Sequence, residues 1–123
     1  MTGKRLILEM GTGNDLHGED YTKAAVRAVQ DAMHHSSLAL FTSLDLDRNA
    51  MEITVTIGVQ APERVDAGQV GQQLPYGRVK VVVVKGGLNV PDPDNDRLSV
   101  VATAGVEARF EIPEGKFRLA ASD

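Results

Sequence analysis

Hydrophobic and polar positions along the chain follow two periods, one typical of β-strands and one typical of an α-helix. Four compact stretches are rich in aliphatic and β-branched residues, as strands are, and they span residues 5–10, 51–58, 78–85 and 98–111. Small and apolar residues recur at helical spacing from Ala24 to Met33. A shorter helix is predicted over residues 66–74. The predicted order is therefore β-α-β-α-β-β.

This order predicts an α+β fold. Asp20 and Asp66 are placed to cap the two helices, because each can accept a hydrogen bond from a free backbone N–H of the first turn. The run RVKVVVVK at 78–85 is the strongest strand, and its unbroken valines predict burial on both faces, as in a central strand. The first strand, which we expect to end at Gly11, is also predicted to be central.

Glycines and prolines predict where the remaining elements are interrupted. Gly86-Gly87 is expected to break or bulge the third strand, and Gly105 to bulge the fourth. Residues 90–96, which contain two prolines and three aspartates, are expected to form a turn. Residues 114–123 show no clear period and are expected to be a mobile tail. Because no repeat or linker divides the chain, residues 1–123 are predicted to form a single domain.

The densest set of polar groups lies in the stretch 11–23, GTGNDLHGEDYTK, between the first strand and the first helix. Its glycines predict a flexible loop that can approach a ligand closely. The helix N-terminus that follows favours an anion, and Lys23 and Arg27 add positive charge one turn apart. The simpler interpretation of Asp20 is a cap. We expect the ligand-binding residues to include Thr12, Asn14, Lys23, Arg27, Ser36, Lys85 and Asn89.

His17 is the candidate general acid or base, because the pKa of histidine lies nearest neutrality. Asp15 or Asp20 would orient it. The same carboxylates and His17 suit a metal ion, but no metal-binding histidine spacing occurs and no metal site is assigned. The alternative is a structural His17 that hydrogen-bonds loop carbonyls. Ser36 follows His35, which suggests a hydroxyl nucleophile beside its base. Neighbours in sequence rarely have the required geometry, so packing or ligand contact is expected instead of catalysis. The sequence identifies no cofactor.

Composition excludes several classes of protein to which the chain could belong. The chain has 123 residues, of which 42% are hydrophobic and 24% charged, as in an ordinary globular domain. A net charge of -4 without a Lys/Arg cluster argues against a nucleic-acid partner. Without cysteine, disulfides and thiolate chemistry are excluded. No apolar run approaches the roughly 20 residues of a membrane helix, so we expect no membrane partner and a cytoplasmic location.

The predicted order resembles the Bacillus chorismate mutase-like fold, which implies a mixed four-stranded sheet backed by helices on one face. Members of that fold form trimers with ligand pockets between subunits. Gly13-Asn14, followed by Asp20-Tyr21-Thr22 and a small-residue helix, is similar to one repeat of cyanuric acid hydrolase and barbiturase, the ring-opening amidohydrolases. Those enzymes carry three repeats in one chain, so the resemblance implies that a single-repeat chain forms a homotrimer. Their catalytic Lys and Ser are matched here by Gly11 and by Ile57-Gly58-Val59, so the chain lacks both groups at the matching places.

As a whole, the chain resembles a small bacterial family of conserved hypothetical proteins. The resemblance rests on four short patterns: Asp15-Leu16-His17-Gly18, Thr22-Lys23-Ala24-Ala25, Arg27-Ala28-Val29 and His35-Ser36.

Together these features predict a trimeric small-molecule-binding protein or enzyme with a polar pocket between subunits. The pocket would be lined by residues 11–23, Arg27 and Lys85 and would bind a small polar or anionic molecule. The alternative is a non-catalytic trimeric scaffold or ligand sensor whose polar loop is structural. Whether the chain is an enzyme stays open at this point.

Overall fold

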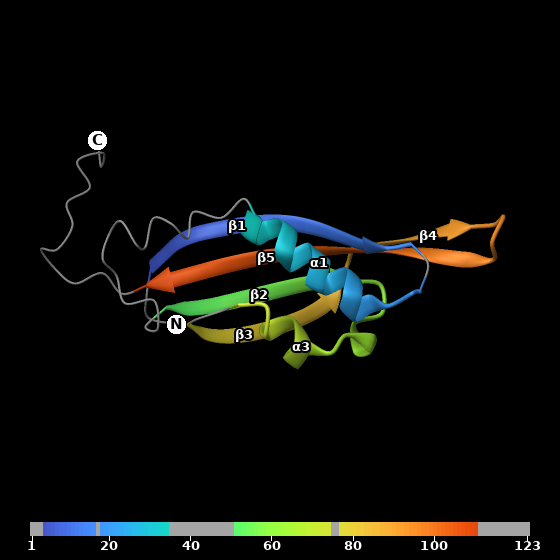
Figure 1. Ribbon diagram of the computed structural model, residues 1–123. Helices are drawn as coiled ribbons and strands as arrows, with labels where there is room; N and C mark the ends of the chain where they lie inside the picture. The colour runs from blue at the N-terminus through green and yellow to red at the C-terminus, as the bar shows by residue number, and fades with distance from the viewer. Residues whose placement is uncertain (1–3, 17, 35–50, 75–76, 111–123) are drawn as a thin grey trace, which may run out of the picture.

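The computed structural model describes residues 4–16, 18–34, 51–74 and 77–110 (Figure 1). Its elements follow one another in the order β1 (Lys4–Asp15), α1 (Tyr21–His34), β2 (Glu52–Val59), the 3₁₀ turn η2 (Pro62–Arg64), α3 (Ala67–Gly71), β3 (Arg78–Lys85), β4 (Leu88–Asp92) and β5 (Arg97–Phe110). The predicted tail at 114–123 lies outside the described residues.

The fold is α+β, as predicted, with a mixed sheet of five strands and two helices. The strand order is β1-β5-β2-β3, and β4 pairs with the N-terminal half of β5. β5 runs antiparallel to β1, β2 and β4, while β2 and β3 are parallel. Both helices lie against the same face of the sheet, and the β4–β5 hairpin extends beyond it at one end (Figure 1).

β1 is longer than the sequence predicted, because residues 11–15 continue the strand instead of forming a loop. They pair in unbroken register with β5, from Gly11 opposite Ala104 to Asp15 opposite Val100. Their burial alternates along the strand: Gly11, Gly13 and Asp15 are buried, and the residues between them are exposed. This period of two is the signature of a strand with one face packed, and it overrides the turn-like composition of the stretch.

The glycines of β1 allow α1 to lie directly against the strand. A Cβ on Gly13 would stand 2.3 Å from the backbone nitrogen of Ala28, and one on Gly11 would stand 2.4 Å from the carbonyl oxygen of the same residue. The helix presents its smallest side chains here: Ala24, Ala28 and Ala32 are fully buried. Backbone therefore packs against backbone, and no side chain can be added between the two elements.

Both strands predicted to be central, β1 and β3, lie at the edges of the sheet. The free edge of β1 is covered by side chains of α1. Asp31 Oδ2 accepts a hydrogen bond from the Thr12 backbone N–H at 2.9 Å, and Arg27 Nη1 donates to the Asn14 carbonyl at 2.7 Å. Satisfying an edge in this way removes donors and acceptors that would otherwise pair with another chain.

The valines of β3 are half-buried or exposed instead of buried on both faces. Those that face the helices contact α3, whose Gly71 lies beside Val79 and Val81. The opposite face of β3 has no covering element among the described residues. The continuous valine run therefore reflects parallel pairing with β2 at an edge, not a place in the centre of the sheet.

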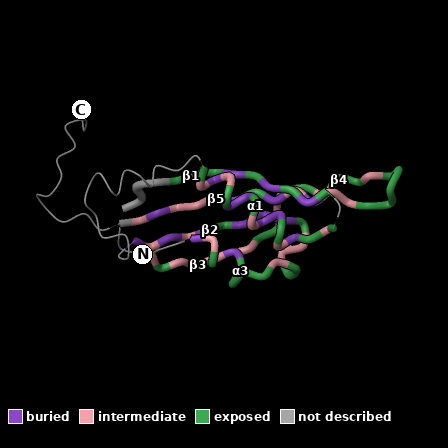
Figure 2. The backbone as a smooth tube through the Cα atoms, viewed as in Figure 1, coloured by how far each residue is buried: buried purple, intermediate pink, exposed green. Residues whose placement is uncertain are grey.

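The core lies between the sheet and the two helices (Figure 2). β2 gives every second side chain to it, as predicted, and α1 contributes its apolar face. Asp66 caps α3 by accepting from the Gln69 N–H at 3.1 Å, also as predicted. The largest fully buried side chains are Val29, Met51, Val55, Ile57, Val59, Val70 and Val100.

Gly86 and Gly87 end β3, as predicted, and lead into a strand that the sequence did not predict. Gly87 has φ 62°, a left-handed conformation in which its Cβ position would overlap the Val101 carbonyl oxygen, so glycine is required. The chain then passes the end of β2 at Gly58 and pairs with β5 as β4. Strand β4 includes Pro91, whose missing N–H is tolerated because β4 is an edge strand.

The turn predicted at residues 90–96 is shorter than predicted: it spans residues 93–96, and residues 90–92 belong to β4. Asn95 Nδ2 donates to Asp92 Oδ2 at 2.8 Å, and the Asp94 N–H donates to Oδ1. The pKa of the Asp92 carboxyl is lowered, chiefly by the hydrogen bond from the Asn95 side chain. The backbone N–H groups of Asp94 and Asn95 and the charge of Arg97 lower it further, and desolvation opposes them. Gly105 pairs in register on both sides, so the bulge predicted there is absent; the register shift lies in β1, between Arg5 and Ile7.

The close contact of α1 with β1 predicts that Gly13→Ala destabilises the fold. The added methyl overlaps helix backbone, which cannot rotate away as a side chain can, so the free energy of unfolding should fall by about 3 kcal/mol or more. Gly105→Ala is the control, since its Cβ position is 3.7 Å from Met10 Sδ, an ordinary contact. Chemical denaturation of both variants measures the difference. Equal stability of the two would contradict backbone-to-backbone packing.

Candidate functional site

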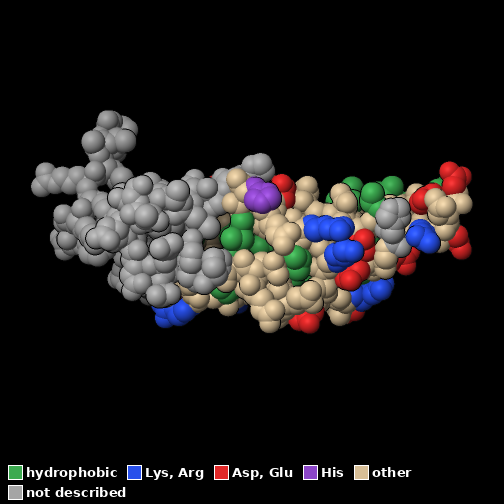
Figure 3. Space-filling view, in the orientation of Figure 1, with side chains coloured by type: hydrophobic (Ala, Val, Ile, Leu, Met, Phe, Trp, Pro, Cys, Tyr) green, Lys and Arg blue, Asp and Glu red, His purple; other side chains and the backbone are tan. Residues whose placement is uncertain are grey.

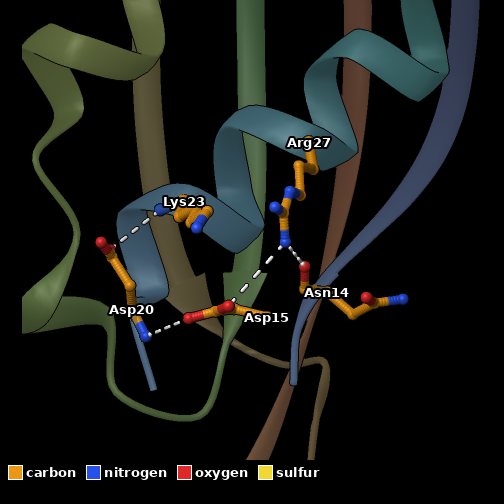
Figure 4. A network of polar contacts seen from close by, with 5 residues as sticks. All are labelled: Asn14, Asp15, Asp20, Lys23 and Arg27. Carbon is orange, nitrogen blue, oxygen red and sulfur yellow. Dashed lines mark hydrogen bonds and ion pairs between the residues drawn. The ribbon is translucent and has the colours of Figure 1, made fainter. Parts of the chain in front are cut away.

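The candidate site lies where β1 ends and α1 begins, around the buried carboxylate of Asp15. Asp15 is 4% exposed, and it is the only charged residue that is buried in the described part of the chain. Asp15 Oδ2 accepts a hydrogen bond from the Asp20 backbone N–H at 2.9 Å, and Oδ1 lies 3.8 Å from Arg27 Nη1 (Figure 4). The carboxylate therefore joins the end of the strand, the connecting loop and the helix.

Gly18 closes this loop over the carboxylate. A Cβ at Gly18 would stand 2.9 Å from Asp15 Oδ2, so a side chain would press on the oxygen that accepts from Asp20. The glycine is therefore needed here for close approach. The residue that takes the left-handed conformation in this loop is Glu19, with φ 51°.

The N-terminus of α1 is capped by Asp20, as the sequence predicted. Asp20 Oδ1 accepts from the Lys23 backbone N–H at 3.0 Å, and the Asp20 carbonyl accepts the first helical bond from Ala24. The Asp20 carboxylate is exposed at the mouth of the site. Its capping role is thus established, and its catalytic role stays a prediction.

Two cations border the site from the exposed face of α1. Arg27 is held in place by the Asn14 carbonyl and the Asp15 carboxylate, yet 46% of its side chain is exposed. The Lys23 ammonium makes no hydrogen bond or ion pair with the described residues. Asn14, Asp15, Leu16, Gly18, Asp20, Lys23 and Arg27 line an open cleft of about 460 Å³. Figure 3 shows basic and acidic side chains mixed over this part of the surface.

The other predicted ligand-binding residues do not all reach this cleft. The Thr12 backbone is bound by Asp31 at the edge of β1, and its side chain is on the sheet face away from α1. Lys85 lines a separate cavity on that same face. Asn89 Nδ2 donates to the buried Tyr21 hydroxyl at 2.7 Å, and its Oδ1 is buried without a partner in the described structure. His17 and Ser36 lie outside the described residues.

A set of distant contacts holds the start of α1, and local sequence patterns did not indicate it. Glu19 Oε1 accepts from the Leu98 N–H of β5 at 2.8 Å. Arg64 of η2 lies over the Tyr21 ring, 4.8 Å from its centroid, and Thr22 Oγ1 accepts from the Asp66 N–H at 2.9 Å. These partners are separated by more than 40 residues in the sequence, so no local spacing could have found them.

No three His, Asp or Glu side chains gather in a metal-binding arrangement within the described ranges. The helices described here are also too short or too polar to cross a membrane.

Comparison with known proteins places the chain in a family. Residues 5–108 match the family described as conserved hypothetical protein (Lin0512_fam), and the chain belongs to it. A solved structure, an FtsZ-like protein of unknown function from Nostoc punctiforme, is 37% identical, with a TM-score of 0.78. The match covers 91% of this chain and 99% of that one. No curated protein matches the sequence. Neither description names an activity.

Removing the Asp15 carboxylate is expected to weaken the junction between strand, loop and helix. In Asp15→Ala, the Asp20 N–H loses its acceptor and Arg27 loses its buried partner, which should lower the free energy of unfolding by about 1–3 kcal/mol. Asp15→Asn keeps an acceptor oxygen and should lose less. Urea denaturation compares the two variants, and an unchanged midpoint for Asp15→Ala would contradict this structural role.

Proposed function

We propose that the chain is a small-molecule-binding protein whose pocket is the cleft at the N-terminus of α1. The observation that carries the proposal is that Lys23 and Arg27 flank one cleft of about 460 Å³, with the Lys23 ammonium unpaired among the described residues. The ligand is a small polar molecule that carries a carboxylate or an amide-like group. The positive end of the helix dipole and the two cations favour such a group.

The electrostatics of the cleft support a polar ligand of low net charge. Asp15 and Asp20 offset the two cations, so the described residues of the cleft carry no net formal charge. Asp15 faces Arg27 and is buried, which leaves Lys23 and the exposed part of Arg27 turned to solvent. Because Arg27 is already oriented by the Asn14 carbonyl, little conformational entropy is lost when its remaining N–H groups bind.

A homotrimer with the pocket between subunits is the assembly that fits this proposal. It rests on the resemblance to one repeat of the ring-opening amidohydrolases, which carry three repeats in one chain. Lys85 lines a separate cavity and not the cleft. It contributes to the pocket only if a neighbouring subunit supplies it.

If the protein is an enzyme, His17 is the general acid or base, and Asp15 or Asp20 orients it. His17 is two residues from the buried Asp15 in the sequence and lies outside the described residues. The chain lacks the matching Lys and Ser of the amidohydrolase repeats, so a ring-opening reaction through those groups is not proposed. His17→Ala is expected to abolish turnover of a substrate while the melting temperature stays close to that of the wild type. An unchanged rate would remove His17 from the mechanism.

The second candidate is a non-catalytic trimeric scaffold or ligand sensor. A specific observation favours it: Asp15, Asp20 and Arg27 all make bonds that hold the fold together. If these polar residues have structural roles, they account for the composition of the stretch 11–23 without a catalytic function. A sensor and an enzyme share the same cleft, so the first experiment asks whether the cleft binds at all.

Ligand binding can be measured as a thermal shift against a panel of small mono- and dicarboxylates and cyclic amides. A ligand at a concentration of 100 times its Kd should stabilise the protein by about 2.7 kcal/mol, which is a shift of roughly 10 °C. Lys23→Met should lose the shift but melt like the wild type without ligand, because the ammonium has no partner among the described residues. Lys23→Arg is the control and should keep most of it. If no compound shifts the wild type, the scaffold is favoured.

A further inference from the structure

The charged side chains of the cleft at the N-terminus of α1 differ in whether the protein already pairs them. Asp15 is 4% exposed, accepts from the Asp20 N–H and faces Arg27, so its charge is balanced inside the protein. Asp20 and Lys23 are exposed, and neither forms an ion pair with the described residues. The cleft therefore presents one negative and one positive charge that have no partner in the described part of the chain.

The two oxygens of the Asp20 carboxylate have different roles. Oδ1 caps the helix by accepting from the Lys23 backbone N–H at 3.0 Å. Oδ2 makes no hydrogen bond to the described residues, although Asp20 lines the cleft. Capping requires one acceptor atom and does not account for the second. The same carboxylate can thus hold the helix and accept a hydrogen bond from a ligand.

The charges of the cleft follow one another along the first two turns of α1. Figure 4 shows the Lys23 side chain between the Asp20 carboxylate and the Arg27 guanidinium. Three residues of a helix rise about 4.5 Å and four rise about 6 Å. The guanidinium is also available, because 46% of the Arg27 side chain is exposed. The cleft therefore has a negative end at Asp20 and a positive end at Lys23 and Arg27.

A ligand that matches both ends carries an ammonium group and a carboxylate. A simple carboxylate leaves Asp20 without a partner, and a dicarboxylate brings a second negative charge towards it. A simple amine faces the two cations instead. Because covering a charge without pairing it is costly, each of these ligands loses part of what it gains. An α-amino acid carries both groups on one carbon, and this short separation suits Asp20 and Lys23, which are one helical turn apart.

Leu16 gives this polar cleft an apolar wall. Its side chain is 49% exposed, as one of six large hydrophobic residues that are exposed in the described chain. Small-molecule sites typically combine apolar contact with a few charged or polar groups that fix the orientation of the ligand. An aliphatic group laid on Leu16 removes apolar surface of both partners from water. The wall therefore favours a ligand with an aliphatic side chain.

We propose that the cleft binds a free α-amino acid with an aliphatic side chain, in its zwitterionic form. The ammonium group of the ligand donates to Asp20 Oδ2, and its side chain lies on Leu16. The carboxylate accepts from Lys23 and Arg27. This inference rests on the proposed function, because it names the ligand class of the same cleft. It adds a requirement for an amino group on the ligand, which the proposed function does not contain.

Isothermal titration calorimetry with probes of one carbon skeleton tests the inference on the full chain. The probes are leucine, isocaproate, which lacks the amino group, and isoamylamine, which lacks the carboxylate. Leucine should bind about tenfold more tightly than either, because each missing group removes a charge-assisted hydrogen bond. Glycine, which cannot cover Leu16, should also bind more weakly than leucine. Isocaproate that binds as tightly as leucine would overturn the inference.

Asp20→Asn separates the charge of this residue from its capping role. Asparagine caps helices about as well as aspartate does, so the variant should stay folded, which a melting curve verifies. Its affinity for leucine should fall about tenfold, while its affinity for isocaproate should stay the same or rise. Asp94→Asn makes the same change in net charge at an exposed position of the β4–β5 turn and should bind leucine like the wild type. An equal loss for leucine and isocaproate in Asp20→Asn would contradict a contact with the amino group.

Lys23→Met separates this inference from the proposed function. The variant should bind both leucine and isocaproate more weakly, because both place a carboxylate at the ammonium. If a simple carboxylate or a cyclic amide binds in a way that depends on Lys23 and leucine does not bind, the amino-acid inference fails and the proposed function stands. If neither leucine nor any of the carboxylates and amides binds the wild type, both fail together.

Discussion

The contact between α1 and β1 is the constraint on which the other features depend. Gly11 and Gly13 have no side chains, and the helix meets them with alanines, so helix and strand approach backbone to backbone. Larger side chains at these positions would hold the helix farther from the strand. Only the closer approach lets Asp31 and Arg27 reach the free edge of β1, and it also brings the start of the helix beside Asp15.

The candidate cleft is therefore assembled from parts that the fold requires. Asp15 receives the Asp20 N–H, Arg27 secures the Asn14 carbonyl, and Gly18 leaves room for the carboxylate. Groups held by structural bonds are rigid, which favours recognition because less entropy is lost on binding. The distant contacts of Glu19 and Arg64 extend this rigidity to β5 and η2. A site of this kind tolerates change at Lys23 far better than at Asp15.

Much of the fold was predictable from local periods, because the strands β2, β3 and β5, the helix α1 and both caps are encoded by neighbouring residues. The stretch 11–15 was misinterpreted because its composition is that of a turn, although its burial alternates as in a strand. Strand order was not predictable: the valines of β3 suggested a central strand, and pairing with distant β5 decided otherwise. For the site, Asp15, Asp20, Lys23 and Arg27 do come together, whereas Lys85 and Asn89 belong to other surfaces. His17 and Ser36 lie outside the described residues.

The position of β5 has a consequence for how the protein is made. In the described sheet, β1 and β4 pair only with β5. Asp15 pairs with Val100, which lies 85 residues later in the sequence. During synthesis only β2 and β3 can pair early, so β1 must wait with an open edge until residues 97–110 leave the ribosome. Contacts of such long range form slowly, and unpaired edges attract other chains. The nascent protein is thus most vulnerable just before β5 emerges, because the centre of the described sheet is completed only then.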